Sequence, residues 1–213
     1  MIISHEHQAY KDKWAMLGVG GQNNGAYFYS QEIIKNIIPE IRTDRNWITV
    51  NIPPYGADHS IVFVHNNNNT NNYDWLKQYK DLILVCGVPD TCDKVRHLGK
   101  PIYLPLSVDV AEIEKHKKPK KKMWAYVGRR KKRAYYNFLP HIDYIEDLPR
   151  DQLLDAMAEY RYIYAVGRCA IEAKVLGCKI FTYDERYPDP DLWQVLDNHD
   201  AAKILQDKLD IID

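Results

Sequence analysis

Two segments of the chain combine glycine with charged side chains in a way that suits a phosphorylated ligand. In the first, an apolar run over residues 123–127 leads into Gly128, and Arg129 and Lys132 follow among other cations. Cations fixed at the carboxyl end of a strand can neutralise the charge that develops on a departing diphosphate. An ordinary solvated cationic loop is the alternative. We predict an anion-binding strand end at Gly128.

The second segment, residues 162–177, has the pattern of a strand, a glycine and a helix. The strand ends at Gly167, the helix begins at Arg168, and Glu172 lies among small and apolar residues in the early turns. A carboxylate in this place can accept two hydrogen bonds from a ribose diol, while the free amides of the helix start face phosphate. The alternative is a solvent-facing glutamate paired with a lysine. We favour a nucleotide-binding role.

A third candidate is the glycine-rich turn at residues 17–26, whose possible ligand contacts are Gly20, Gly21 and Asn24. Glycine lets a ligand approach backbone amides closely, and the helix start that follows favours an anion. The spacing differs from the GxGxxG pattern of dinucleotide-binding turns. We therefore interpret the turn as a generic loop on the substrate side.

Neither the cysteines nor the histidines form a pattern that predicts a metal site or a cofactor. The four cysteines match neither a zinc knuckle nor a CxxC pair, so we expect buried free thiols. His5 and His7 flank Glu6, but neighbours in an extended segment point to opposite faces. We interpret this triplet as surface and predict no metal and no cofactor.

The charge of the chain is balanced overall but unevenly spread. The 29 basic and 29 acidic residues give a net charge of zero, yet cations crowd into residues 117–133, which we call the basic band. Such a band suits a phosphate group, an acidic lipid surface or nucleic acid, and a solvated charged face is the alternative. For nucleic acid, aromatic residues of the band and its flank would stack on bases: Trp124, Tyr126, Tyr135 and Tyr136.

Short apolar, β-branched or aromatic runs recur along the chain and predict strands. They lie at residues 47–52, 61–65, 82–86, 102–106, 123–127, 162–166 and 179–183. Residues 61–64 and 82–85 are apolar at every position, which is typical of parallel strands with helices on both faces. The fold class that follows is α/β, as two small Rossmann-like lobes with parallel sheets.

Periodic apolar stripes predict two helices, and a third is predicted where a strand is followed by a segment that ends at a glycine. They are expected over residues 33–41, 151–160 and 168–176, the last ending at Gly177. Between them, the asparagine-rich tract 66–73 predicts a loop at a strand end, acting either as a lid or as a plain surface insertion.

The strongly charged segment 106–117 is the expected boundary between two domains, residues 1–110 and 111–213. No run of residues is apolar enough for a membrane span, and the first residues lack the order of a secretory signal. We expect a cytoplasmic protein.

The order of these segments resembles the retaining, nucleotide-sugar-dependent glycosyltransferases of the GT-B fold, in a compact form. Residues 102–109 are similar to the proline-bearing strand and hydrophobic-Asp turn that end the N-terminal lobe, and residues 127–129 with a following lysine to the Gly-Arg opening of the C-terminal lobe. Residues 145–154 are similar to the segment before the donor-site strand, and residues 170–177 to the small-residue helix with a central glutamate.

The resemblance implies a role for several residues. Arg129 and Lys132 would bind the donor diphosphate and Glu172 the ribose, with Gly167 and Arg168 beside them. Gly20 and Gly21, with Asn24 in the same turn, would lie near the sugar or phosphate, and His65 beside the transferred sugar as the catalytic candidate. The chain departs from the family at Tyr164, where a first glutamate is expected, and in its short length.

The function implied is metal-independent transfer of a sugar from a nucleotide-diphosphate sugar, carrying uridine or guanosine, to an acceptor hydroxyl. Residues 1–110 would form the acceptor-side lobe and residues 111–213 the nucleotide-sugar lobe. One alternative is a non-catalytic protein that binds a nucleotide or nucleotide-sugar, and another is a nucleic-acid-associated protein that uses the basic band. The acceptor is open, with DNA or an anionic lipid surface compatible with the band, and so is assembly into a homo-oligomer.

Overall fold

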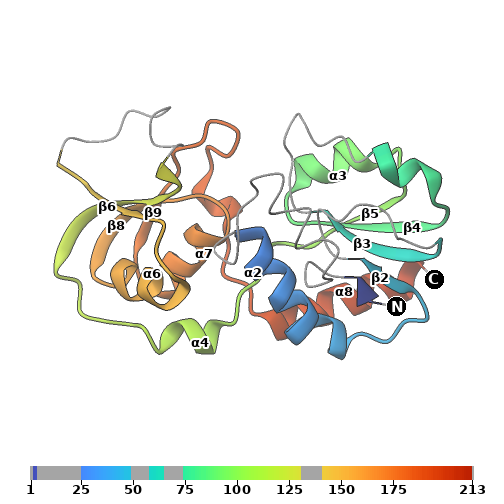
Figure 1. Ribbon diagram of the computed structural model, residues 1–213, viewed down its shortest axis with the longest axis horizontal. Helices are drawn as coiled ribbons and strands as arrows, with labels where there is room; N and C mark the ends of the chain where they lie inside the picture. The colour runs from blue at the N-terminus through green and yellow to red at the C-terminus, as the bar shows by residue number, and fades with distance from the viewer. Residues whose placement is uncertain (1, 4–24, 49–57, 65–73, 131–140, 213) are drawn as a thin grey trace. The chain divides into compact units, whose positions relative to one another are not determined.

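A computed structural model of the chain describes residues 2–3, 25–48, 58–64, 74–130 and 141–212. The chain divides into two compact units (Figure 1). The first unit comprises Met1–Pro105 together with Asn198–Asp213, and the second comprises Leu106–Asp197. This division differs from the predicted one, because the segment after residue 197 returns to the first unit instead of closing the second.

The first unit contains a five-stranded parallel sheet in the order β1-β2-β3-β4-β5. Its strands are β1 (Ile2–Ile3), β2 (Asn46–Ile48), β3 (Ser60–Val64), β4 (Leu82–Cys86) and β5 (Lys100–Tyr103). Every residue of β3 and β4 is buried, as the unbroken apolar runs predict for parallel strands covered on both faces. The register sets Ile61 beside Ile83 and Val85 beside Ile102.

Helical segments accompany this sheet. They are α2 (Gly25–Glu32), the π-helical η1 (Ile33–Ile37), the 3-10 segments η2 (Ile38–Glu40) and η3 (Asp74–Gln78), α3 (Pro89–Val95) and α8 (Asn198–Ile212). The predicted isoleucine stripe is confirmed at Ile33, Ile37 and Ile38, which are buried. Figure 1 shows α3 and α8 on opposite sides of the sheet.

Helix α8 is the element that was not expected in the first unit. It buries Ala201, Ala202, Leu205 and Leu209 along one face and packs against η1. Helix α8 also contacts η2, where His199 Nδ1 lies 2.6 Å from Glu40 Oε2. An amphipathic stripe needs an apolar partner, and the isoleucine stripe of η1 provides it.

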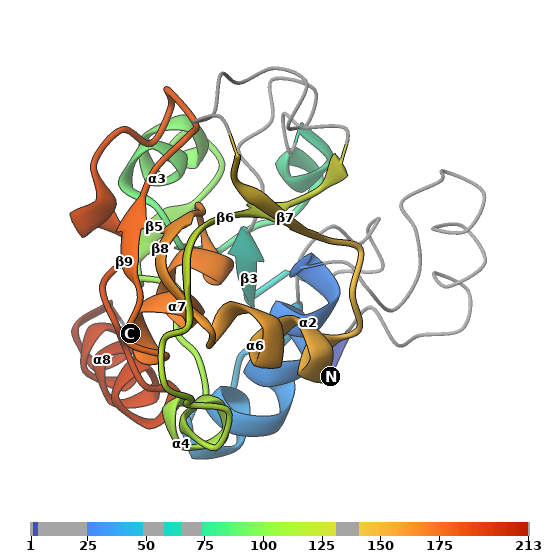
Figure 2. The same cartoon turned by 90° about the vertical axis from the view of Figure 1, so that its left-hand side faces the viewer.

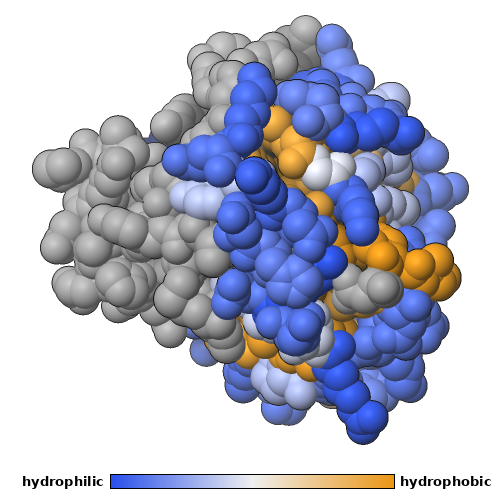
Figure 3. Space-filling model, turned by 90° about the vertical axis from the view of Figure 1, so that its right-hand side faces the viewer, coloured by the Kyte–Doolittle hydropathy of each residue, from blue (hydrophilic) through white to orange (hydrophobic). Residues whose placement is uncertain are grey.

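Figure 3 shows one face of the molecule coloured by hydropathy. Among the described residues on this face, hydrophilic ones predominate, and the apolar ones form a band that reaches the right-hand edge together with smaller patches. Among the described residues of the first unit, one large apolar residue is exposed: Ile211, with 84% of its surface accessible. No helix within the described ranges has both the length and the apolar character needed to cross a membrane.

The second unit contains a four-stranded parallel sheet in the order β7-β6-β8-β9 (Figure 2). Its strands are β6 (Lys122–Gly128), β7 (Asp143–Glu146), β8 (Tyr160–Tyr164) and β9 (Lys179–Phe181). Its helical segments are α4 (Val110–Glu114), α6 (Arg150–Met157), α7 (Arg168–Val175) and the 3-10 segment η4 (Pro190–Leu192). The fold class is therefore α/β with two parallel sheets.

The two faces of the second sheet differ in composition. Side chains alternate along a strand, so the buried Ala125, Val127 and Ile163 share one face, and helices α6 and α7 pack against strands of this sheet. The opposite face carries an aromatic layer formed by residues of three strands: Trp124, Tyr162, Tyr164 and Phe181. The ring centroids of five pairs among these residues lie between 4.6 Å and 6.2 Å apart.

The two places where the chain passes between the units lie side by side within the second unit. Val108 forms a parallel bridge with Asp197, and its backbone N–H donates to the carbonyl of Leu196 at 3.0 Å. The amide of Val110 donates to Asp197 Oδ2 at 3.2 Å. Hydrogen bonds thus join the first and last residues of the second unit to each other.

Candidate site at the switch point of the second sheet

Strand order in the second unit reverses at one point. The chain starts in β6, goes to β7 on one side, and then crosses back to β8 on the other side of β6. In open parallel sheets, ligands bind in the crevice beyond the carboxyl ends of the strands at such a reversal. The carboxyl ends of β6 and β8, with the helix starts beside them, form what we call the switch-point edge.

Gly128 ends β6 at this edge because a larger residue would displace a buried tyrosine. A Cβ at Gly128 would stand 2.3 Å from the hydroxyl oxygen of Tyr126, whose side chain is fully buried. That hydroxyl donates to the backbone oxygen of Arg129 at 3.2 Å. The tyrosine therefore fixes the path of the chain as it leaves the strand. The backbone of Arg129 is held by this hydrogen bond, while its side chain is exposed.

Gly167 starts α7 at the same edge. Its φ of +65° and ψ of −142° lie in a region that residues with a Cβ rarely adopt. A Cβ built on Gly167 would meet no atom of the described residues within 4 Å, so among these residues it is the backbone conformation that requires glycine and not a steric overlap. The first turn of α7 thus begins beside open space, where helix amides favour an anion.

Glu172 lies one turn into α7 and is buried, with a side chain 1% exposed. Its Oε1 accepts a hydrogen bond from Arg168 Nε at 2.6 Å and another from Arg150 Nη1. Its Oε2 is also buried and has no hydrogen-bond partner among the described residues. The alternative of a solvent-facing glutamate paired with a lysine is wrong, because the carboxylate is buried between two arginines.

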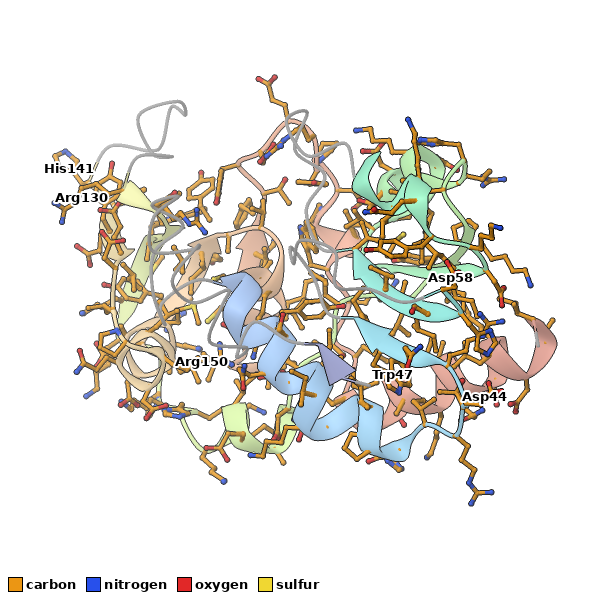
Figure 4. The ribbon with its side chains drawn as sticks, turned by 45° about the vertical axis from the view of Figure 1, so that its right-hand side comes forward. Asp44, Trp47, Asp58, Arg130, His141 and Arg150 are labelled. Carbon is orange, nitrogen blue, oxygen red and sulfur yellow. The ribbon has the colours of Figure 1, made fainter. Side chains whose placement is uncertain are left out.

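Arg150 is the residue of this edge that sequence reasoning missed. It is the first residue of α6, which follows β7 (Figure 4), and its side chain is 20% exposed. Helices that follow parallel strands begin at the carboxyl edge, which brings the start of α6 near the start of α7. Arg150 could have been placed at this edge from the order of strands and helices, but only if residues 143–146 had been recognised as a strand.

The turn after β9 adds a further polar pair in the second unit. Asp184 is buried and accepts from Arg186 Nε at 2.9 Å and from Arg186 Nη2 at 2.6 Å. The ring of Tyr183 packs 5.1 Å from that of Tyr126, and burial raises the pKa of Tyr183 far above its usual range. Tyr183 therefore stays a neutral phenol at physiological pH.

The predicted site residues separate into two groups. Arg129, Gly167, Arg168 and Glu172 lie in the second unit, at or next to the switch-point edge. The others lie outside the described residues: Gly20, Gly21, Asn24, His65 and Lys132.

Tyr164 occupies the position where the resemblance leads one to expect a glutamate. Its ring belongs to the aromatic layer, with centroids 5.5 Å from Trp124 and 5.8 Å from Phe181. A carboxylate at this position would replace an aromatic contact, and the layer provides a structural reason for tyrosine here.

Much of the basic band is neutralised within the second unit. Lys117 pairs with Glu114 at 2.6 Å and Lys118 with Asp155 at 2.6 Å. Lys122 pairs with a carboxylate in the same way, at 3.1 Å from Glu159 Oε2. The net positive charge at the surface of the band is therefore smaller than the number of its lysines and arginines suggests.

Lys120, also in the band, has a structural role. Its Nζ donates to the backbone oxygens of Ala158 and Leu176, each at 2.8 Å, and lies 3.2 Å from Cys178 Sγ. These carbonyls follow the ends of α6 and α7, where helix carbonyls lack intrahelical partners. Lys120 thus caps both helices.

Within the described ranges, no three His, Cys, Asp or Glu side chains are grouped so that they could hold a metal ion. The four cysteines are thiols outside any disulfide; Cys86, Cys92 and Cys178 are buried, as predicted, whereas Cys169 is half-buried. Burial raises the pKa of the Cys178 thiol, which keeps it protonated.

A separate charged cluster lies at the amino ends of β3 and β4 in the first unit. His59 Nδ1 is 2.7 Å from Asp81 Oδ2, and His59 Nε2 is 3.1 Å from Asp44 Oδ1. The buried Arg45 pairs with Asp81 at 3.2 Å. Hydrogen bonds to Asp81 and Asp44 raise the pKa of His59, and those to His59 lower the pKa values of both carboxyl groups.

Comparison of the chain with family models, with curated proteins and with solved structures found no match. The functional argument therefore depends on the residues of the switch-point edge.

Proposed function

We propose that the chain binds a nucleotide-diphosphate sugar at the switch-point edge and transfers the sugar to an acceptor hydroxyl without a metal ion. One observation carries the proposal: the order β7-β6-β8-β9 brings the two glycine-marked strand ends, after β6 and after β8, to the same edge. Each strand end is followed by an arginine, Arg129 or Arg168. This is the edge at which parallel sheets bind nucleotides.

Each part of the donor has a candidate partner. The diphosphate would lie over the start of α7, beside the open space at Gly167, with Arg129 neutralising charge on the leaving group. The ribose would donate a hydroxyl hydrogen to Glu172 Oε2, a buried oxygen for which the described residues provide no donor. Lys132 would reinforce the diphosphate contact.

The first unit would serve as the acceptor lobe of a compact, cytoplasmic GT-B-like enzyme. Gly20, Gly21 and Asn24 would contact the sugar or phosphate, and His65 would lie beside the transferred sugar. The acceptor would be a hydroxyl compound, with DNA or an anionic lipid surface as the anionic candidates, and the chain would act alone or as a homo-oligomer.

A non-catalytic nucleotide-sugar binding protein is the second candidate. The observation that favours it is Tyr164, whose ring packs into the aromatic layer where a glutamate would touch the donor sugar. A nucleic-acid-associated protein is less favoured, because carboxylates pair with several lysines of the basic band.

The test is a thermal-shift screen against UDP, GDP and their sugars, followed by an assay of nucleoside diphosphate release. Ligand at a hundred times its Kd should add about 2.7 kcal/mol of stability. We expect one nucleotide-sugar to stabilise the wild type and not Glu172→Ala, with Glu159→Ala as a matched surface control. Release of diphosphate supports transfer, binding without release supports the second candidate, and no response to any nucleotide contradicts both.

A further inference from the structure

Three charged residues stand in a row at the amino-terminal edge of the first sheet. The register joins the first residues of β2, β3 and β4 to one another. The residues that come just before these strands are therefore neighbours as well: Arg45, His59 and Asp81. Because parallel strands begin at one edge of a sheet, this row brings together three turns that lie far apart in the sequence.

His59 and Asp81 are the firmly held part of this row, and we call them the fixed pair. His59 Nδ1 lies 2.7 Å from Asp81 Oδ2, and Nη1 of the buried Arg45 lies 3.2 Å from the same oxygen. The backbone N–H of His59 donates to the carbonyl of Lys80 at 3.0 Å, and its own carbonyl accepts from the N–H of Asn46 at 3.1 Å. Side-chain and backbone bonds together fix both residues at the sheet edge.

The backbone of the fixed pair is unusual. His59 and Asp81 have φ of +58° and +53°, and they are two of the four non-glycine residues with positive φ in the described part of the chain. Residues with a Cβ adopt this left-handed region at an energetic cost and stay in it where surrounding contacts determine the conformation. Such residues gather at binding sites and switch regions, and here two of them are in direct contact.

Asp44 makes a third contact with this group, and that contact is looser. His59 Nε2 lies 3.1 Å from Asp44 Oδ1, and the side chain of Asp44 is 87% exposed against 43% for Asp81. Asp44 belongs to the segment between η2 and β2, in which the N–H of Arg42 donates to Gln206 Oε1 of α8 at 2.7 Å. His59 thus ties one end of a surface segment to the fixed pair, while α8 holds the other end.

The imidazole ring of His59 needs a proton on each nitrogen to hold both carboxylates. The charged ring has two N–H donors, whereas the neutral ring has one donor and one acceptor. A neutral His59 would therefore turn a lone pair toward one of the two carboxylates, and that contact would be lost. Asp81 is nearer and is also held by Arg45, so Asp44 is the carboxylate that the neutral ring releases.

We propose that His59 is a proton-controlled latch, which holds the segment of Asp44 against the fixed pair when both ring nitrogens are protonated and releases it when Nε2 gives its proton to solvent. Hydrogen bonds to Asp81 and then to Asp44 raise the pKa of His59. The latch is therefore closed below about pH 6.5 and opens as pH rises through the raised pKa. This inference does not depend on the proposed function.

The other charged groups at this edge oppose or leave unchanged the effect of the two carboxylates. The positive charge of Arg45 lowers the pKa of His59, but it contributes less than the hydrogen bonds to the carboxylates. Asp58 Oδ1 accepts from the backbone N–H of Lys80 at 2.6 Å. Lys80 and Lys100, at the starts of β4 and β5, are exposed residues. The net result is a raised pKa, so the carboxylates decide the charge of the ring.

The experiment is an NMR titration of the full chain from pH 5 to pH 9. The ring signals of His59 are identified by their loss in His59→Gln, and we expect them to share one midpoint, above the ordinary 6.5, with the backbone amide of Asp44. On the alkaline side, the ring nitrogen shifts should show a neutral ring that carries its proton on Nδ1. The heteronuclear NOE of the Asp44 amide should fall through the same midpoint, while that of Asp81 should stay constant.

Two substitutions of the exposed Asp44 separate a latch from a passive contact. An asparagine amide both accepts and donates, so in Asp44→Asn it can bond to either form of the ring, and the NOE of residue 44 should stay high at every pH. In Asp44→Ala the NOE should be low at every pH, and in both variants the pKa of His59 should fall. Asp93→Asn is the control, because Asp93 is an exposed carboxylate of α3 that pairs with Arg96 at 2.9 Å, and it should keep the wild-type titration.

The outcomes that would overturn the latch are distinct from those that concern the nucleotide-sugar. A neutral ring protonated on Nε2, or an Asp81 amide that changes with the ring while the Asp44 amide does not, would show that the ring holds the other carboxylate. A His59 midpoint equal in Asp44→Ala and the wild type would show that Asp44 is not bound to the ring. A failed nucleotide screen leaves the latch standing, and a failed titration leaves the proposed function standing.

Discussion

Replacing Gly167 with alanine isolates the energetic cost of a backbone conformation. A Cβ at this position would meet no atom within 4 Å in the part of the chain that the structure describes, so the substitution introduces no steric overlap there. The whole cost comes from holding a residue with a Cβ at φ +65° and ψ −142°, which is about 1–3 kcal/mol. We expect Gly167→Ala to lower the free energy of unfolding of the second unit by this amount.

Gly177 provides a matched comparison in the same unit. It also has positive φ, +81°, and among the described residues the nearest atom to its Cβ would be Lys120 Cε, at 3.9 Å. Gly177→Ala should therefore cost about 1–2 kcal/mol, again without a steric contribution. Because Gly177 follows the C-terminal end of α7 and Gly167 precedes its start, only Gly167→Ala should also weaken ligand binding.

The assay is urea unfolding followed by tryptophan fluorescence and circular dichroism. With a slope of about 2 kcal/mol per molar urea, a loss of about 1–3 kcal/mol lowers the midpoint by about 0.5–1.5 M at constant slope. A Gly167→Ala midpoint equal to that of the wild type would show that the positive φ is not required, and would refute the reasoning. A fall in the midpoint well beyond this range would indicate a steric overlap of the alanine Cβ that the described residues do not account for.

Two further predictions concern side chains with defined partners. His59 has its pKa raised by Asp81 and Asp44, so its contribution to stability is complete below about pH 6.5 and is lost as pH rises through the raised pKa. Melting temperatures measured from pH 5 to pH 9 should therefore fall on the alkaline side in the wild type and less so in His59→Gln. Lys120→Met leaves the carbonyls at the ends of α6 and α7 without their cap, and urea unfolding should show a loss of about 1–3 kcal/mol.

Exposed neighbours serve as controls for these two changes. His97→Gln alters an exposed histidine in the same unit as His59 and should keep the wild-type pH dependence. Lys121→Met alters the exposed lysine next to Lys120 and should leave stability within about 0.5 kcal/mol of the wild type. A pH dependence unchanged in His59→Gln, or equal losses in both lysine variants, would contradict the assigned roles.

Strands buried on both faces were predictable because burial leaves a continuous apolar run. The runs at residues 61–64 and 82–85 correspond to β3 and β4, which are buried throughout. Strand β7, with the sequence Asp-Tyr-Ile-Glu, was missed because it is an edge strand with one buried residue, Ile145. Its short polar sequence shows neither an apolar run nor a clear alternation.

Part of the candidate site was predictable for the same local reason. A strand, a glycine and a helix are continuous in sequence at Gly167, so Arg168 and Glu172 could be assigned to one edge together. Arg150 could not, because its partner Glu172 is 22 positions away and the contact depends on how α6 and α7 pack. The place of α8 depends likewise on a contact spanning 159 positions, between Glu40 and His199.

The return of α8 to the first unit has a consequence for the order in which the protein is made. Residues 106–197 form a continuous stretch, so the second unit has all of its chain once Asp197 has left the ribosome. The sheet of the first unit is synthesised earlier. The isoleucine stripe of η1 nevertheless stays uncovered until α8, with Leu205 and Leu209, has been synthesised and can pack on it. The unit that starts first is therefore completed last, and the apolar surface it shows in the interval is one that a chaperone could bind.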